Sequence, residues 1–325
     1  MVNRLIYSFF IIVISISFVL IYFIYHKKNI KQPVLFEINN GESIKEVSKK
    51  LENQGIVENW ELMYLLIRMR NKTVKKGTYE FKDELSLDDI WKIITQGKEK
   101  LFPITIVPGD NLFIIAKKLD KNKIVPEKDF LNFTLNPENV KKYRLKGNSF
   151  EGYFPPETYL FRRNENIEKV VKQFLDIYNK CYLPILKNSK EIEPYNMMKI
   201  ASMVEKETSI LEEKPIIAGI IINRLKKRMP LQVDATVIYA MYLQNKWSGK
   251  LKKTHLKGVK SEFNTYLNYG LPPTPICSFS IETLKSVLNY KKTNYLYYLT
   301  IDNKKHIFSE SYEKHRRILE NIKHH

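Results

Sequence analysis

The chain begins with a long uncharged apolar run. Residues 5–25 read LIYSFFIIVISISFVLIYFIY. As a helix, this run would be about 32 Å long, which matches a hydrocarbon core of about 30 Å. Tyr7, Tyr22 and Tyr25 stand where the two membrane interfaces would lie. No small-residue cleavage site follows, so the pattern predicts an uncleaved single-pass transmembrane helix rather than a cleaved signal peptide.

A strand–turn–helix pattern then occurs twice. FEINNGESIKEVSKKLENQGIV (36–57) aligns without a gap to ITIVPGDNLFIIAKKLDKNKIV (104–125). Each copy starts with the alternation of a short strand and turns at a glycine, Gly41 or Gly109. Polar cap residues and apolar residues at helical spacing follow. The pattern therefore predicts a duplicated supersecondary unit.

The segment between the two copies has its own elements. Trp60–Met69 and Leu87–Gln96 have helical patterns, and YEF at 79–81 is typical of a strand. We therefore expect a small α+β module over 36–100. A cytoplasmic tail (1–4), the transmembrane helix (5–25) and a linker (26–35) would precede it, and a catalytic domain (101–325) would follow it.

The duplicated unit resembles the LysM-like element of cell-wall proteins. In that family the element contacts glycan strands, so the resemblance implies that 36–57 and 104–125 contact sugar. The alternative is an ordinary strand–helix duplication that only builds a hydrophobic core. The pattern leaves both interpretations open.

Two glutamates stand one lysine apart in ASMVEKETSI, within a helical pattern over Asn196–Ile210. Residues two apart on a helix point about 200° from each other, so Glu205 and Glu207 are not expected to form one acid pair. Glu207 continues the apolar stripe of Met203 and Val204, whereas Glu205 falls at its edge. Burial would raise the pKa of Glu207 above about 4.3 and suit it to general acid catalysis. A buried glutamate paired with a core arginine or lysine is the alternative.

Several polar motifs follow this helix. Pro215 is positioned to open a second helix that ends in Asn223-Arg224. MPLQVDATVIYAMY (229–242) then places polar residues at every second position, as in a strand, at Gln232, Asp234 and Thr236. FNTY (263–266) and a proline-fixed loop, GLPPTPI (270–276), come next. The segment 295–309 is typical of a hairpin with His306 on its second strand.

Composition narrows the possible function classes. The 325 residues carry a net charge of +19, which can indicate nucleic acid, an anionic membrane or another anionic polymer. The positive charges are scattered and mostly lysine, and no aromatic ladder of an RNA-binding type occurs. Cys181 and Cys277 fit no metal or redox spacing, and either a disulfide or two thiols is possible. No metal-binding motif is found, and no cofactor is expected.

The ordered set of motifs resembles the endolytic murein transglycosylase family, also described as YceG-like. It comprises EGYFPPETY, VEKET, INRL, LQ-x-D-x-TVIYA, NTY, GLPP-x-PI, NYLYY and H-x-F. Some positions depart from the family pattern: Ala235, Thr274 and Glu157 replace proline, glycine and aspartate, and Lys304–Lys305 replace a glycine-rich turn. The resemblance implies an α+β fold with an N-terminal transmembrane helix, a LysM-like α+β module and a mixed α+β catalytic domain.

The resemblance also implies a reaction. Members of the family are lyases that cut the β-1,4 bond between N-acetylmuramic acid (MurNAc) and N-acetylglucosamine (GlcNAc) within glycan strands, and leave 1,6-anhydroMurNAc ends. An ordinary glycosidase needs two carboxylates, whereas an internal hydroxyl nucleophile removes that need. The family's catalytic glutamate aligns with Glu207, which the stripe also selects. Glu205 is the second candidate for the acid.

A wider set of polar residues is expected to line the substrate cleft, although each has an ordinary structural alternative, such as ending a helix or joining a strand ladder. The substrate-binding candidates are Glu157, Glu205, Asn223, Arg224, Gln232, Asp234, Thr236, Asn264, Thr265 and Tyr266. His306 is expected in the same cleft. Two rival functions remain: a non-catalytic peptidoglycan-binding scaffold, and a hydrolase in which Asp234 or Glu157 assists Glu207.

The expected substrate decides the expected topology. Peptidoglycan lies outside the cytoplasmic membrane, so the N-terminus would be inside and the catalytic body outside. Lys27, Lys28 and Lys31 follow the apolar run and argue the other way by the positive-inside rule. Because only four residues precede the run, we let the substrate decide. Peptidoglycan synthase complexes are expected partners, and nucleic acid is not.

Overall fold

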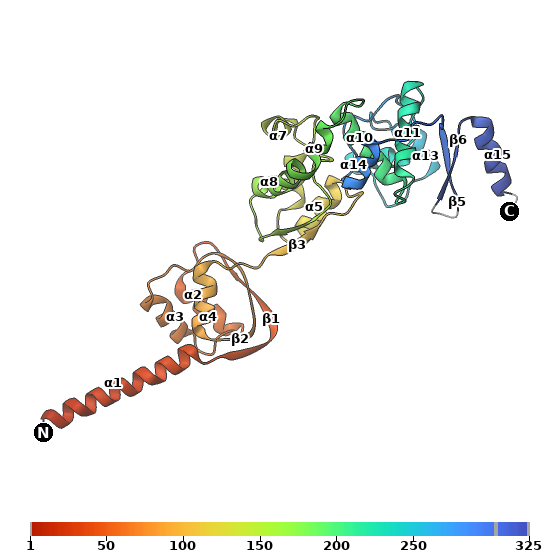
Figure 1. Ribbon diagram of the computed structural model, residues 1–325. Coiled ribbons are helices and arrows are strands. Elements are labelled where there is room, and N and C mark those ends of the chain that lie inside the picture. Colours follow the sequence, from red (N-terminus) through yellow and green to blue (C-terminus); the bar gives the residue numbers. More distant parts are fainter. Residues whose placement is uncertain (1, 302–304, 324–325) are drawn as a thin grey trace. The chain divides into compact units, whose positions relative to one another are not determined.

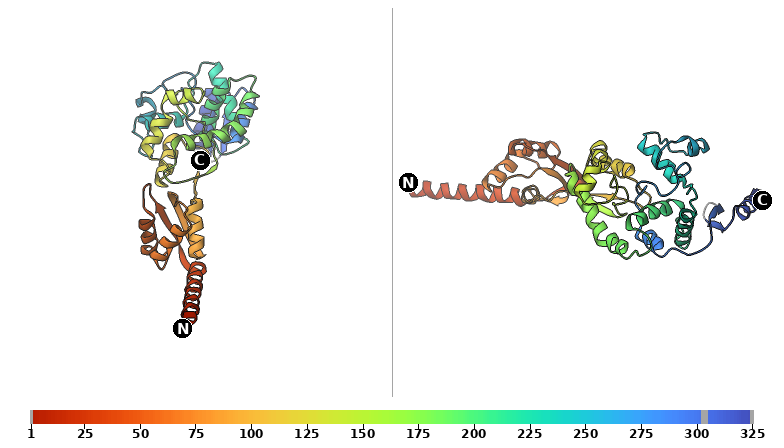
Figure 2. Two further views of the ribbon diagram at one scale, coloured as in Figure 1. Left: turned by 90° about the vertical axis from the view of Figure 1, so that its left-hand side faces the viewer. Right: turned by 90° about the horizontal axis from the view of Figure 1, so that it is seen from above.

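The computed structural model describes residues 2–301 and 305–323, and it is shown in Figures 1 and 2. The chain divides into two compact units, Met1–Phe102 and Pro103–His325. Both units contain helices together with short two-stranded sheets. The mixed α+β class predicted from the sequence is therefore confirmed.

The apolar run forms helix α1 (Val2–Tyr25). Its segment Ile6–Tyr25 is long and apolar enough to cross a membrane, and its large side chains are exposed. Backbone hydrogen bonds are satisfied within a helix, so such a segment is suited to lipid. The predicted N-terminal apolar helix is confirmed.

The rest of the first unit is a small α+β module. In chain order its elements are β1 (Lys28–Ile38), α2 (Ile44–Asn53), α3 (Trp60–Met69), β2 (Gly77–Leu85) and α4 (Leu87–Gln96). Strands β1 and β2 pair antiparallel, with Phe36 opposite Tyr79 and Val34 opposite Phe81. Residues 28–35, which the sequence analysis assigned to a linker, belong to β1. Polar residues predominate in the first half of this strand, where Ile30 packs against the core, so the sequence there lacks a clear strand pattern.

Local sequence signals set the helix ends of this module. Ser43 caps α2 and Ser86 caps α4, each in a capping box with the residue three positions later. The α4 helix stops at Gly97, whose φ of 71° is accessible to glycine without strain. The apolar faces of α2, α3 and α4 pack against the inner faces of both strands and form one hydrophobic core. This core includes Phe36, Leu51, Met63, Tyr79 and Ile94.

The second unit is larger and mostly helical. Its strands are β3 (Phe102–Thr105) with β4 (Thr158–Phe161), and β5 (Tyr297–Ile301) with β6 (Lys305–Ser309). Its helices are α5 (Leu112–Lys121), α6 (Glu127–Thr134), α7 (Pro137–Lys142), α8 (Ile167–Ile177), the π-helix η1 (Tyr178–Tyr182), α9 (Leu183–Lys187), α10 (Pro194–Glu207), α11 (Lys214–Lys226), α12 (Asp234–Leu243), α13 (Lys253–Gly258), α14 (Ile281–Leu288) and α15 (Tyr312–Lys323).

The predicted repeat is present at the level of elements. In the first copy β1 leads through Gly41 into α2, and in the second β3 leads through Gly109 into α5. Both glycines have a positive φ, 86° and 90°, which a residue with a Cβ adopts only with strain. The strand–turn–helix pattern is confirmed in both copies.

Two predictions within the second unit are wrong. Helix α10 ends at Glu207 and does not continue to Ile210, because Thr208 adopts an extended conformation. The segment with alternating polar residues forms helix α12 from Asp234 onward, and no strand is present there. Its side chains Ala235, Thr236 and Val237 are all buried, so polar alternation did not mark an exposed face.

Helices α10, α11, α12 and α14 pack together around the carboxylate stretch. The predicted hairpin is confirmed as β5 and β6, with Tyr298 opposite Phe308 and Thr300 opposite His306. Its turn, including Lys304, lies outside the described residues. Cys181 and Cys277 are free thiols, so the disulfide alternative is not realised.

Candidate active site

Glu207 is the last residue of α10, and its side chain is half-buried. The hydroxyl of Tyr298, on β5, donates a hydrogen bond of 2.9 Å to its Oε2. Burial raises the pKa of Glu207 above its ordinary value, and the Tyr298 hydroxyl offsets part of this rise. Among the described residues, Glu207 has no ion-pair partner. A protonated carboxyl at the end of a helix, reachable from solvent, is chemically able to donate a proton.

A second carboxylate lies near this glutamate. Asp234, exposed at the start of α12, accepts a hydrogen bond of 2.5 Å from the hydroxyl of Tyr266. Its negative charge also acts to raise the pKa of Glu207, while His306 and Arg224 act to lower it. The structure therefore brings Asp234 and Tyr266 toward the same site as Glu207.

Three predicted site residues are buried and hold this wall of the site in place. The hydroxyls of Thr236 and Thr265 lie 2.9 Å apart, and the backbone of Gln232 and Val233 bonds to Thr265. Asn264 donates from its side chain to the backbone carbonyls of Leu256 in α13 and of Val259 at the end of that helix. Thr236, Asn264 and Thr265 are at most 1% exposed, so they position the loop and do not reach a substrate. Gln232 is exposed, with φ of 54°.

Asn223 and Arg224 tie α11 to the segment that leads into β5. The side-chain amide of Asn223 donates to the carbonyls of Thr293 and Tyr295, at 2.7 and 3.0 Å. Arg224 donates to the carbonyls of Leu296 and Leu231, both at 2.7 Å. These bonds fix the strand that presents Tyr298, which is their structural contribution to the site.

Glu205 has a different environment from Glu207. Its side chain is 6% exposed and forms an ion pair with Lys214 at 2.9 Å. Ser280 and Thr283 donate to its Oε2 from a backbone N–H and two hydroxyls. Burial acts to raise the pKa of Glu205, but these donors outweigh it and the net pKa is lowered. The buried ion pair considered for Glu207 is thus formed by Glu205.

Glu157 lies apart from this group. It is exposed and lines a separate cavity of about 460 Å³ together with Tyr182 and Glu282. No hydrogen bond or ion pair between described residues joins it to Glu207.

Tyr298 and Glu213 contribute to the site but were not among the predicted site residues. Glu213, directly before α11, accepts the backbone N–H of His306 at 2.9 Å, and its Oε2 lies 2.7 Å from His306 Nδ1. It also accepts the hydroxyl of Thr208, the residue after Glu207. Burial acts to raise the pKa of Glu213, but these donors lower it overall. Glu213 therefore joins β6 to the end of α10. Tyr298 lies in the motif NYLYY (294–298), but that motif contains three tyrosines and its pattern does not show which of them faces Glu207. Glu213 lies in none of the quoted motifs.

Two known bacterial proteins with sequences similar to this chain are both named endolytic murein transglycosylase. An endolytic murein transglycosylase of Bacillus subtilis is 27% identical over 317 residues, which cover 90% of this chain and 86% of that protein. One of Streptococcus pneumoniae strain D39 is 27% identical over 320 residues, which cover 89% of this chain. This chain spans only 58% of the streptococcal protein's length.

A solved structure is also similar. The crystal structure of a YceG-like protein from Listeria monocytogenes matches with a TM-score of 0.59 and 28% sequence identity. The match covers 89% of this chain and all of that chain. The model of the YceG-like family matches residues 36–321, which include Glu207, Asp234 and Tyr298. These residues of the site therefore lie within the segment that the family model matches, and this chain belongs to the YceG-like family.

Proposed function

We propose that this chain is an endolytic murein transglycosylase, a lyase that cleaves the MurNAc–GlcNAc β-1,4 bond within nascent glycan strands. The similar proteins of Bacillus subtilis and Streptococcus pneumoniae carry that name. The observation that carries the proposal is the environment of Glu207: half-buried, with a raised pKa, hydrogen-bonded to Tyr298 and without an ion-pair partner among the described residues.

In the proposed reaction Glu207 acts twice. Its protonated carboxyl first gives a proton to the glycosidic oxygen, so that the C1–O4 bond breaks and the GlcNAc hydroxyl leaves. The Glu207 carboxylate then accepts the proton of the MurNAc 6-hydroxyl as that oxygen bonds to C1. The 1,6-anhydro ring closes, no water is consumed, and the acid is regenerated. Tyr298 stabilises the intermediate carboxylate, because its hydroxyl donates to Oε2.

The remaining predicted site residues divide into two proposed groups. Asp234 and Tyr266 lie close enough to Glu207 to interact with its charge, and Gln232 is exposed two residues before Asp234. These three residues are proposed to contact sugar. The second group holds the walls of the cleft through buried hydrogen bonds: Glu205, Asn223, Arg224, Thr236, Asn264 and Thr265. His306 is proposed to act with Glu213 in holding β6. Glu157 is proposed to contact glycan only away from the cleavage point.

Location and modular organisation are part of the proposal. Helix α1 would be a single-pass anchor in the cytoplasmic membrane, with the N-terminus inside and the catalytic body outside. The module at 36–100 and the unit at 104–125 would be LysM-like and contact glycan, while 101–325 would form the catalytic domain. An anchored enzyme reaches only glycan near the membrane, which suits termination of nascent strands beside peptidoglycan synthases.

The test is a digest of purified peptidoglycan by the full-length protein in detergent, with products identified by mass spectrometry. We expect the wild type to release fragments with anhydromuramyl ends, lighter by one water than hydrolysed ends. Glu207→Gln should lose this activity by at least about 100-fold, because a general acid contributes about 10²–10⁴ in rate. Glu212→Gln is the matched control, since Glu212 is exposed and only five residues away.

Other products would point to the rival functions. Reducing ends that disappear in Asp234→Asn would identify a hydrolase with Asp234 as its second carboxylate. Binding of peptidoglycan without any cleavage by folded wild-type protein would support the non-catalytic scaffold. Activity that survives in Glu207→Gln would remove Glu207 from the mechanism.

A further inference from the structure

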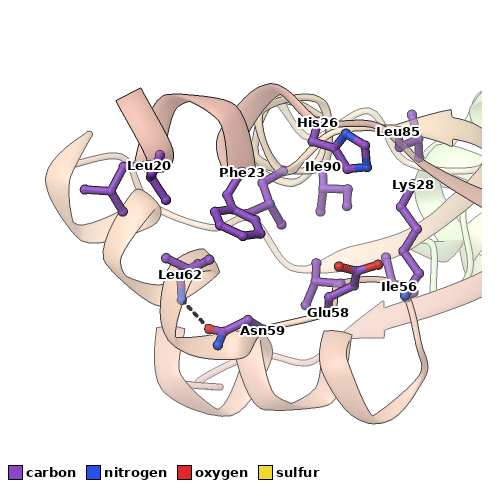
Figure 3. Close-up of a pocket in the computed structure, with 13 residues that line it drawn as sticks. Leu20, Phe23, His26, Lys28, Ile56, Glu58, Asn59, Leu62, Leu85 and Ile90 are labelled. Carbon is purple, nitrogen blue, oxygen red and sulfur yellow. Dashed lines mark hydrogen bonds between the residues drawn. The ribbon is translucent and has the colours of Figure 1, made fainter. Parts of the chain in front are cut away.

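An apolar cavity of about 420 Å³ lies within the first unit, beside the end of α1 (Figure 3). Val19, Leu20 and Phe23 of α1 form one wall. Leu62 of α3 and Ile90 of α4 are among the residues that form the opposite wall. The volume falls in the range of pockets that hold one small ligand, about 300–1,000 Å³.

One wall of this cavity belongs to the segment that is long enough to span a membrane. That segment ends at Tyr25, only two residues after Phe23. With α1 in a bilayer, Val19, Leu20 and Phe23 therefore lie in the last turns before the interface. The cavity then opens at the level where acyl chains meet headgroups, so its natural occupant is hydrocarbon rather than water.

A neighbouring helix face has the same character. Leu62, Leu65 and Met69 follow one another on α3 at spacings of three and four residues, which places them on one side of the helix. Leu65 is 45% exposed and Met69 is 75% exposed. Exposed apolar residues beside an apolar cavity indicate a surface that contacts lipid or another apolar partner. A helix with such an exposed apolar face is suited to the membrane interface.

The rim of the cavity is basic. His26 and Lys28 line it, Lys27 and Lys31 are close in the chain, and the first acidic residue of the sequence is Glu37. Glu58 is the one carboxylate among the lining residues. Lysines beside a membrane span attract anionic lipid headgroups. Binding of anionic headgroups would explain why lysines follow α1 on the side of the membrane that is proposed to be outside, although the positive-inside rule predicts them on the cytoplasmic side.

We propose that this cavity binds one acyl chain of an anionic bilayer phospholipid, whose phosphate lies against Lys28 and His26. The bound lipid holds the module, residues 28–96, against the bilayer surface. The proposal depends on insertion of α1, which belongs to the proposed function, and it is independent of catalysis by Glu207.

The test uses the full-length protein in nanodiscs that contain phosphatidylcholine and phosphatidylglycerol, followed by native mass spectrometry of the released protein. The wild type should retain one phosphatidylglycerol. Leu62→Trp fills the cavity and should lose the bound lipid. Leu101→Trp is the control, because Leu101 is an exposed leucine of the first unit that does not line the cavity, and it should keep the lipid. Lys28→Gln should abolish the preference for phosphatidylglycerol over phosphatidylcholine.

The outcomes separate this proposal from the anchor and from catalysis. Equal lipid retention by wild type, Leu62→Trp and Lys28→Gln would overturn it, since the lipid would then be held non-specifically around α1. Wild-type protein that is recovered in nanodiscs but retains no lipid would also overturn it. Failure to recover the protein with nanodiscs would reject both the anchor and the lipid site. Glu207→Gln should retain lipid as the wild type does.

Discussion

The carboxyl of Glu151 is expected to make the stability of the second unit fall as pH rises. Glu151 is fully buried, and its Oε2 accepts the backbone N–H of Leu112 at the start of α5 at 3.0 Å. Its other oxygen has no hydrogen-bond partner among the described residues. Burial raises the pKa of Glu151 from 4.5 to about 8, despite opposing contributions from Leu112, Tyr239 and Gly152.

The direction of the effect follows from proton binding. Between these two pKa values the unfolded chain has released the proton while the folded chain still holds it, so stability decreases with rising pH. From about pH 5 to about pH 8 the loss is about 3.5 kcal/mol, somewhat less than 1.36 kcal/mol for each pH unit because ionisation is partial at both ends of this range. Glu151→Gln cannot ionise and should not show this loss. The variant should therefore become more stable relative to the wild type as pH increases.

The assay is urea unfolding of the full-length protein in detergent at several pH values, with tryptophan fluorescence as the measure of unfolding. Trp60 and Trp91 lie in the first unit, and their replacement by phenylalanine leaves Trp247 to report on the second unit alone. Glu157→Gln is the control, because Glu157 is exposed in the same segment of chain. Parallel pH profiles for Glu151→Gln and wild type would refute the reasoning, since they would show that Glu151 is ionised in the folded protein.

Two further predictions concern the two glutamates. Tyr298→Phe removes the hydrogen-bond donor to Glu207, so the pKa of Glu207 should rise further. We expect kcat to fall about tenfold, which corresponds to about 1.4 kcal/mol, and the high-pH limb of the pH–rate profile to move to higher pH. A limb that does not move would contradict the role of this bond. Lys214→Met leaves Glu205 as an unpaired buried charge and should cost about 3–5 kcal/mol of unfolding free energy. The double variant with Glu205→Gln should recover most of that loss in the same denaturation assay, and additive losses would show that the two residues do not interact.

The sequence alone determined the elements whose signals are local. An uncharged run predicted α1, and helical patterns predicted α3 and α4 with the observed bounds. Turn glycines and alternation predicted the duplicated strand–turn–helix unit and the β5–β6 hairpin. These features depend on residues within one or two turns of each other, where spacing and capping act directly.

Tertiary structure decided the environment of each glutamate. Helical spacing placed Glu205 at the edge of an apolar stripe, yet Ser280 and Thr283, some 75 and 78 positions later, enclose it together with Lys214. Glu207 meets Tyr298, 91 positions away, and receives no ion pair among the described residues. Periodicity gives the direction in which a side chain leaves its helix, but burial and pKa depend on what packs there. Distant segments supply those neighbours, so the folded chain shows why the pKa of Glu207 is raised while that of Glu205 is lowered.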